Sequence, residues 1–274
     1  EVIKPLIKDM ATKKVTKKKT AKVVTKKAKA IAKVKALKHK RVVMEPVGTE
    51  TLPEMVKIVT APNWAGELIG KWAAAKLGGK KAVIALLDIF NDRMVSVDYC
   101  RDNGFLKGMG IDVKNPKIMG DEAKTGKYSG GDYVIVGNKA TGANEDGGRT
   151  GLEQLLAKNK AINVVYTINE PTAAGACAAL KAAGTQAIVV SVDGGRAGIE
   201  NVKSGCIGAT SQQYPLLMAD LGVQAIYDIV KTGKKPEVTP GLDFFNTGVT
   251  LITDDPQKGV DSKDTTYGLE KAWG

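Results

Sequence analysis

From residue 81 onward, short apolar runs alternate with helical stretches, and this alternation limits the fold more than any other feature. The apolar runs are residues 82–87, 132–137, 162–167, 187–192 and 206–211. The helical stretches are residues 94–109, 148–159, 171–183, 196–204 and 214–232. Strands that are apolar on both faces and alternate with helices form a parallel sheet covered on both sides. We therefore predict an α/β fold, a doubly wound parallel sheet with right-handed crossovers.

Polar side chains stand where these predicted strands end. Asp193 directly follows the run 187–192, while Asn169 and Gln213 each follow their run by two positions. Arg101 lies about two turns into the helix after the first strand and must reach back over the sheet edge. In doubly wound sheets the ligand lies beyond the carboxyl ends of the strands. We expect these four side chains to converge on one crevice.

Each of the four residues also has a simpler explanation when it is taken alone. Asn169 could cap a helix, Asp193 could be a turn residue, and Arg101 and Gln213 could be solvated. Together, however, they supply a carboxylate that accepts, a guanidinium that donates and amides that do both. Sugar hydroxyls need such a mixture, so the set favours a polyol ligand.

Signatures of catalysis and of metal binding are missing from the sequence. The single histidine, His39, lies before residue 42, which excludes Ser-His-Asp and Cys-His catalysis from the remaining chain. No phosphate-binding loop and no dinucleotide motif is found. Cys100, Cys177 and Cys206 form no CxxC motif, and we expect them to be small buried residues rather than a disulfide or a metal site. We predict a protein that is not an enzyme and that has no cofactor.

Positive charge is concentrated at the start of the chain. Residues 1–41 carry 15 Lys and 1 Arg against Glu1 and Asp9, a net charge of +14, whereas the other 233 residues carry 25 basic and 27 acidic side chains. Residues 11–41 are therefore a candidate for non-specific contact with anions or nucleic acid. The simpler interpretation is a disordered tail, or a sequence that replaced another segment through truncation, frameshift or fusion.

Several segments of the chain resemble the periplasmic sugar-binding proteins of ABC importers, of the ribose-binding type and most closely the fructose-binding branch. They read "NVVYTINEPTAAGACAALKAAG" (163–184), "VVSVDGG" (189–195), "IGATSQQYPLLMADLGVQAI" (207–226) and "GVTLITDDP" (248–256). "VSVDYCRDNGFLKGMGID" (95–112) and "AGELIGKW" (65–72) extend the similarity over about residues 60–274.

The resemblance implies the type I fold of periplasmic binding proteins, with two α/β lobes that are joined by a hinge of three chain crossings and close over a monosaccharide. Arg101, Asn169, Asp193 and Gln213 fall on sugar-contacting positions of the family's C-terminal lobe. The resemblance also implies a fructose-like ligand, a membrane permease as partner, a periplasmic location and a monomer. The sequence shows neither a signal peptide nor a membrane-spanning run.

The N-terminal lobe is expected to be incomplete. Only about sixty residues precede "AGELIGKW", and they show no strand and helix alternation. We expect a lysine-rich atypical segment at 1–55, a remnant of the N-terminal lobe at 56–80, the C-terminal lobe at 81–245, and a hinge return with the C-terminal segment at 246–274. The segments 56–60, 64–77 and 247–253 would then expose apolar faces.

A basic nucleic-acid-associated protein that carries a degenerate sugar-binding lobe is the alternative function. It predicts that labelled duplex DNA binds with an affinity that falls steeply between two salt concentrations, because lysines would displace counterions from phosphates. A fluorescence titration measures this. Affinity too weak to detect even at low salt would remove the alternative.

Overall fold

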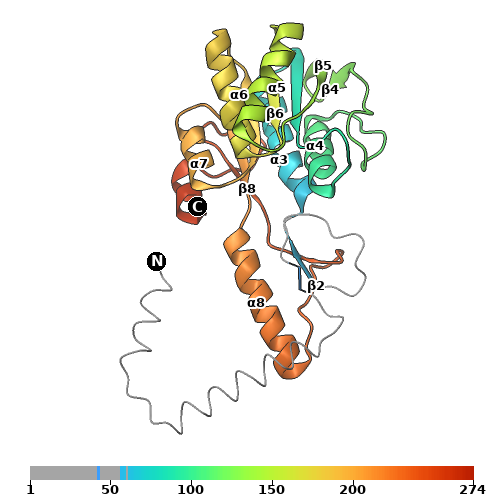
Figure 1. The fold of residues 1–274 in the computed structure, drawn as a ribbon, viewed down its shortest axis with the longest axis vertical. Helices are drawn as coiled ribbons and strands as arrows, with labels where there is room; N and C mark the ends of the chain where they lie inside the picture. Colours follow the sequence, from blue (N-terminus) through green and yellow to red (C-terminus); the bar gives the residue numbers. More distant parts are fainter. Residues whose placement is uncertain (1–41, 44–55, 60) are drawn as a thin grey trace.

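The computed structural model describes residues 42–43, 56–59 and 61–274 (Figure 1). The lysine-rich segment predicted at 1–55 therefore lies outside the described residues, apart from Val42 and Val43. The described chain forms a seven-stranded sheet and a separate three-stranded sheet.

The seven-stranded sheet has a parallel centre and one antiparallel strand at each edge. Its strand order is β10-β8-β7-β6-β3-β5-β4, and the five strands from β8 to β5 run parallel. The bounds are β3 Ala82–Asp88, β4 Thr125–Tyr128, β5 Gly131–Ala140, β6 Val164–Thr167, β7 Ile188–Asp193, β8 Ala209–Gln212 and β10 Thr250–Ile252. All five predicted strands are present, so the predicted parallel sheet is confirmed.

Helices cover both faces of this sheet, and β3 shows why. Its side chains alternate between two cores, with Ile84 packed toward α3 (Pro62–Leu77) and α4 (Ser96–Met109). Ala85 packs instead toward α5 (Glu145–Lys158) and α6 (Glu170–Ala183). Every residue of β3 is buried, as expected for a strand covered on both sides. The shorter helices α7 (Arg196–Lys203) and α9 (Thr265–Lys271) pack against each other.

Glycines allow α3 and α4 to pack backbone against backbone. A Cβ atom added at Gly66 would lie 2.2 Å from the carbonyl oxygen of Arg101, and one at Gly108 would lie 2.2 Å from that of Glu67. Gly70 and Gly104 are equally close to the opposite helix. The prediction that the helix at 64–77 exposes an apolar face is wrong, because Ile69 and Trp72 of α3 are buried in the core of the seven-stranded sheet.

The returning segment at 247–253 also joins the larger sheet. Its strand β10 pairs antiparallel with β8, and Leu251 and Ile252 are buried. The exposure predicted for this segment is therefore wrong as well, because β10 completes one edge of the sheet.

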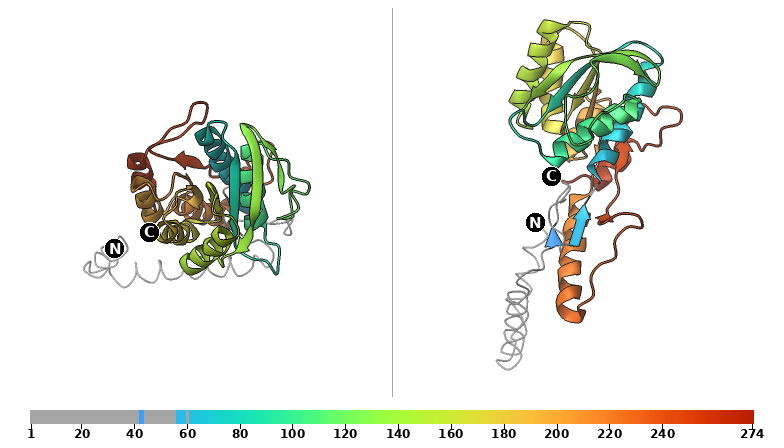
Figure 2. Two further views of the ribbon diagram at one scale, coloured as in Figure 1. Left: turned by 90° about the horizontal axis from the view of Figure 1, so that it is seen from above. Right: turned by 90° about the vertical axis from the view of Figure 1, so that its right-hand side faces the viewer.

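The smaller part of the molecule contains β1 (Val42–Val43), β2 (Val56–Val59) and β9 (Phe245–Asn246), which run parallel in this order. Helix α8 (Pro215–Thr232) contacts β1 and β2 and stands apart from the larger sheet (Figure 2). Since α8 falls within 81–245, the prediction that this whole range forms one lobe is wrong. The chain passes between the two parts three times, as β2 leads to α3, β8 to α8 and β9 to β10.

Helix α8 is apolar on more than one side. Met218 and Ala225 are buried and pack with Leu221 and Phe245, whereas Leu216 and Val223 are 69% and 62% exposed. Among the described residues, no helix combines the length and the apolar content that a membrane span requires.

Cys177 and Cys206 form a disulfide, so the prediction that they are unlinked apolar residues is wrong. Cys177 lies on α6, and Cys206 lies in the loop that enters β8. The two residues are 29 positions apart, and the fold of the chain places their Cα atoms 5.8 Å apart. This distance lies within the usual range for a disulfide.

Replacing both Cys177 and Cys206 by alanine should lower the free energy of unfolding by about 3 kcal/mol, because the bridge restricts the unfolded chain. Urea unfolding with and without a thiol reductant measures this. Cys100→Ala is the control, since this cysteine lies outside the bridge on α4. A reductant that shifts the unfolding midpoint of the double variant as much as that of the unchanged protein would contradict the prediction.

Candidate ligand-binding site

Three of the four predicted site residues meet around the guanidinium group of Arg101. This side chain is buried, and its Nη1 donates to the carbonyl oxygen of Ile168 at 2.6 Å. Nη2 donates to Oε1 of Gln213 at 3.0 Å, and Nη1 lies 3.3 Å from Oδ1 of Asp193. Residues from α4, β7 and the end of β8 therefore converge at the carboxyl edge of the sheet, as the sequence predicts.

Asp193 ends β7 in an unusual backbone conformation. Its φ is 149°, a positive value that residues other than glycine rarely adopt. Its carbonyl oxygen accepts from the backbone N–H of Gln213 at 2.8 Å, which joins the ends of β7 and β8. Burial raises the pKa of the Asp193 carboxyl, and the nearby Arg101 guanidinium opposes that rise. The side chain keeps 18% of its surface exposed, so one flank remains open.

Asn169 lies at the same sheet edge but acts as a helix cap. Its Oδ1 accepts from the backbone N–H of Thr172 at 3.1 Å at the start of α6. Its Nδ2 donates to the carbonyl oxygen of Ala143 at 3.0 Å. Asn169 thus has the capping role that the sequence offered as the simpler explanation, and its contact with a ligand stays a prediction.

The cluster has donors that no acceptor satisfies. Nε of Arg101 and Nε2 of Gln213 are buried and have no hydrogen-bond partner among the described residues. A buried donor without an acceptor costs about 1–3 kcal/mol. Oxygen atoms of a ligand or of water would remove this cost.

Glu170 is a site residue that the sequence reasoning missed. It is 6% exposed, and its carboxylate accepts from the backbone N–H groups of Gly194 at 2.8 Å and Gly195 at 2.9 Å. Burial, and then the charge of Asp193, raise the pKa of Glu170 to about 7. The available sequence signal was an acidic residue directly before the predicted helix at 171–183, which ordinarily indicates only a favourable helix dipole.

Further carboxylates are buried at the end of β3 and on α4, and they were not predicted either. Asp88 ends β3 and accepts from Nδ2 of Asn138 at 3.2 Å. Burial, and then the charge of Asp98, raise the pKa of Asp88 to about 8. Asp102 is fully buried, neither of its carboxylate oxygens has a partner among the described residues, and burial raises its pKa well above the usual range.

These acidic groups do not form a metal centre. In the part of the chain that the structure describes, no three His, Cys, Asp or Glu side chains are arranged to hold a metal ion.

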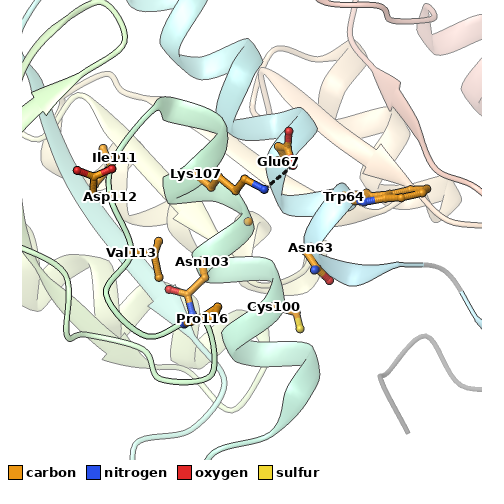
Figure 3. A pocket seen from close by; sticks show the side chains of 11 residues that line it. Asn63, Trp64, Glu67, Cys100, Asn103, Lys107, Ile111, Asp112, Val113 and Pro116 are labelled. Atoms are coloured by element: carbon orange, nitrogen blue, oxygen red, sulfur yellow. Dashed lines mark ion pairs between the residues drawn. The ribbon is translucent and has the colours of Figure 1, made fainter. Parts of the chain in front are cut away.

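Two cavities are bordered by elements that carry or adjoin the Arg101 cluster. One, of about 380 Å³, borders the end of β7 and is lined by Asp193, Glu170 and Gly195 together with Arg196 and Trp273. The other, of about 390 Å³, lies between α3 and α4 and contains none of the predicted site residues (Figure 3). On its wall, Nζ of Lys107 lies 3.9 Å from a carboxylate oxygen of Glu67. Of the four predicted site residues, Asp193 alone lines the first cavity, and none lines the second.

Comparison with known proteins identifies the family. Residues 25–235 match the periplasmic binding protein domain. This chain belongs to the periplasmic binding protein family. The resemblance inferred from the sequence is thereby confirmed for the family. The match begins within the lysine-rich segment, earlier than the sequence resemblance at about residue 60.

One curated relative of this periplasmic binding protein is the ribose import binding protein RbsB of Haemophilus influenzae. The two are 27% identical over 191 residues, which cover 69% of this chain and 58% of the relative. The matched region thus spans less than two thirds of the relative's length.

Solved structures agree on the fold. A galactofuranose binding protein gives a TM-score of 0.60 at 21% identity, covering 79% of this chain and 64% of the other. A solute binding protein of an ABC transporter from Agrobacterium vitis with bound D-fucose gives 0.61 at 22% identity, covering 82% and 68%. The predicted fold class, that of a type I periplasmic binding protein, is confirmed.

The buried carboxylates should make stability depend on pH. Because the pKa of Asp88 is higher in the folded protein than its usual 3.8, the folded state holds a proton that the unfolded state releases. The free energy of unfolding should therefore fall as pH rises from about 4 to about 8. Asp88→Asn should make this slope shallower, by at most the contribution of about one bound proton. Urea unfolding at several pH values measures the slope. The exposed Asp146→Asn should leave the slope unchanged, and an unchanged slope in Asp88→Asn would contradict the assignment.

Proposed function

We propose that this protein binds a monosaccharide at the carboxyl edge of its seven-stranded sheet, as the solute-binding component of an ABC sugar importer. The observation that carries the proposal is the buried cluster of Arg101, Asp193 and Gln213, with Asn169 beside it. Each side chain comes from a different βα unit, so the cluster depends on the folded sheet rather than on any local segment.

The chemistry of the cluster suits an uncharged polyol. A sugar hydroxyl donates one hydrogen bond and accepts others, so its site needs both donors and acceptors. Asp193 can accept, whereas Nε2 of Gln213 and Nε of Arg101 are donors without a partner among the described residues. Arg101 and Asp193 carry opposite charges, so the pair leaves no net charge for the ligand to balance.

We propose a fructose-like ligand because the sequence resembles the fructose-binding branch most closely. The relatives vary in ligand. The curated relative is described as a ribose import protein, and solved neighbours hold D-fucose, D-allose or myo-inositol. This variety supports a small polyhydroxylated ligand in general, while the choice of fructose rests on the resemblance alone.

The proposal extends to partner and compartment. We propose an ABC importer permease as the membrane partner, a periplasmic location and a monomeric state. The disulfide between Cys177 and Cys206 supports the location, because such bonds persist in oxidising compartments. The three chain passages between the two parts support a hinge that opens and closes over the ligand.

Fructose, ribose and related monosaccharides should raise the thermal unfolding temperature, since a ligand that binds only the folded state stabilises it. Asp193→Ala should abolish this response, because it removes the open acceptor of the cluster. Calorimetric titration gives the affinity of each sugar. Asp228→Ala on α8 is the matched control, as it removes a carboxylate far from the cluster.

Two results would count against the proposal. If no monosaccharide changes the unfolding temperature of the unchanged protein, the chain is not a sugar-binding component. If Asp193→Ala keeps its affinity and its fold, Asp193 does not contact the ligand.

A further inference from the structure

The turn that follows β7 carries Asp193 in a conformation that needs support. Asp193 has a φ of 149°, and Gly194 follows with a φ of 82°. A residue other than glycine in such a region costs about 1–3 kcal/mol and persists only where its surroundings hold it. We call residues 193–195 the ligand turn, since it presents the Asp193 carboxylate toward Arg101.

A single buried carboxylate, that of Glu170, binds the backbone of the ligand turn. Oε1 of Glu170 accepts from the N–H of Gly194 at 2.8 Å, and Oε2 accepts from the N–H of Gly195 at 2.9 Å. Oε1 also accepts from the hydroxyl of Thr210 on β8 at 2.8 Å. Glu170 is the first residue of α6, so it joins α6 to the ends of β7 and β8. Hydrogen bonds to an ionised group are about twice as strong as those between neutral groups.

The Glu170 carboxylate also packs closely against α7. A Cβ atom added at Gly198 on α7 would lie 1.9 Å from Cδ of Glu170. An alanine at this position would therefore push the Glu170 carboxylate away from the ligand turn. On the other side, Nε2 of Gln212 donates to the carbonyl oxygen of Gly194 at 3.1 Å. The turn is thus held through both its N–H groups and a carbonyl oxygen.

We propose that Glu170 is a positioning residue, which holds the ligand turn so that Asp193 faces Arg101 and the ligand. The part that concerns ligand affinity rests on the proposed function, whereas the hold on the turn does not. The charged groups around Glu170 are Asp193, which faces it from β7, and Glu145 of α5 and Arg196 of α7, which line the same cavity. Glu170 itself makes no direct contact with Arg101.

Glu170→Gln is the variant that tests the proposal. The amide can still accept from Gly194 and Thr210 through its oxygen, but its NH₂ group would then face the N–H of Gly195 and cannot accept from it. We expect the affinity for the best monosaccharide to fall about tenfold to a hundredfold, as for a lost bond to a charged group. The exposed Glu153→Gln on α5 is the matched control and should keep full affinity.

Amide NMR tests the hydrogen bonds of the ligand turn in the absence of a ligand. In the unchanged protein, the Gly194 and Gly195 amide signals should shift together as the pH passes through about 7, where Glu170 titrates. In Glu170→Gln this shift should vanish, and the Gly195 amide should exchange with solvent faster. Thr210→Val removes a donor from the same carboxylate but leaves both turn contacts in place, so both amide signals should still titrate.

A double variant separates positioning from general stability. Gly198→Ala should displace the Glu170 carboxylate and weaken binding, and Gly198→Ala together with Glu170→Ala should bind no worse than Glu170→Ala alone, because the clash is gone. If the glycine amides titrate unchanged in Glu170→Gln, or if the two substitutions weaken binding additively, the proposal is wrong. If the amides behave as expected but no sugar binds the unchanged protein, Glu170 holds the turn and the proposed function fails.

Discussion

The close packing of α3 on α4 determines where Arg101 stands. Gly66 lies against the carbonyl oxygen of Arg101, so the two helix backbones touch at the turn that carries the guanidinium. A helix held this closely cannot slide along the sheet without a steric clash. The packing therefore fixes the position of Arg101 relative to the strand ends, where its guanidinium contacts Ile168, Asp193 and Gln213.

The central sheet and most of the site could be predicted because both follow from one strong pattern. Five apolar runs alternate with helical stretches and predict the parallel strands, and the residues after such strands gather at one edge of the sheet. This reasoning placed Asp193 and Gln213 beside Arg101, where the structure also has them, and their contact with a ligand stays a prediction. It missed β4, which has three exposed residues and no apolar run. It also missed β9, which is two residues long, because such short pairings depend on tertiary context.

The position of α3 and α8 could not be read from hydropathy. An apolar helix face shows that a helix packs but does not identify the sheet that it packs on, so the sequence reasoning assigned both helices to the wrong part. For α3 a usable signal existed, because Gly66 and Gly70 match the spacing of Gly104 and Gly108, which allows two helices to approach closely. The pairing of Cys177 with Cys206 had no such signal, since it arises from the order of the strands.

At the candidate site, one guanidinium interacts with two carboxylates. Asp193 and Asp98 both interact with the Arg101 guanidinium, while Asp98 also accepts from the backbone N–H groups of Ile89 and Phe90. Burial raises the pKa of both carboxyls, and the guanidinium opposes the rise. Removing one member would leave an uncompensated buried charge, which costs more than the pair contributes when intact. Because the Arg101 guanidinium is already paired with carboxylates, a ligand that enters gains most by offering hydroxyl groups and gains little by adding a charge of its own.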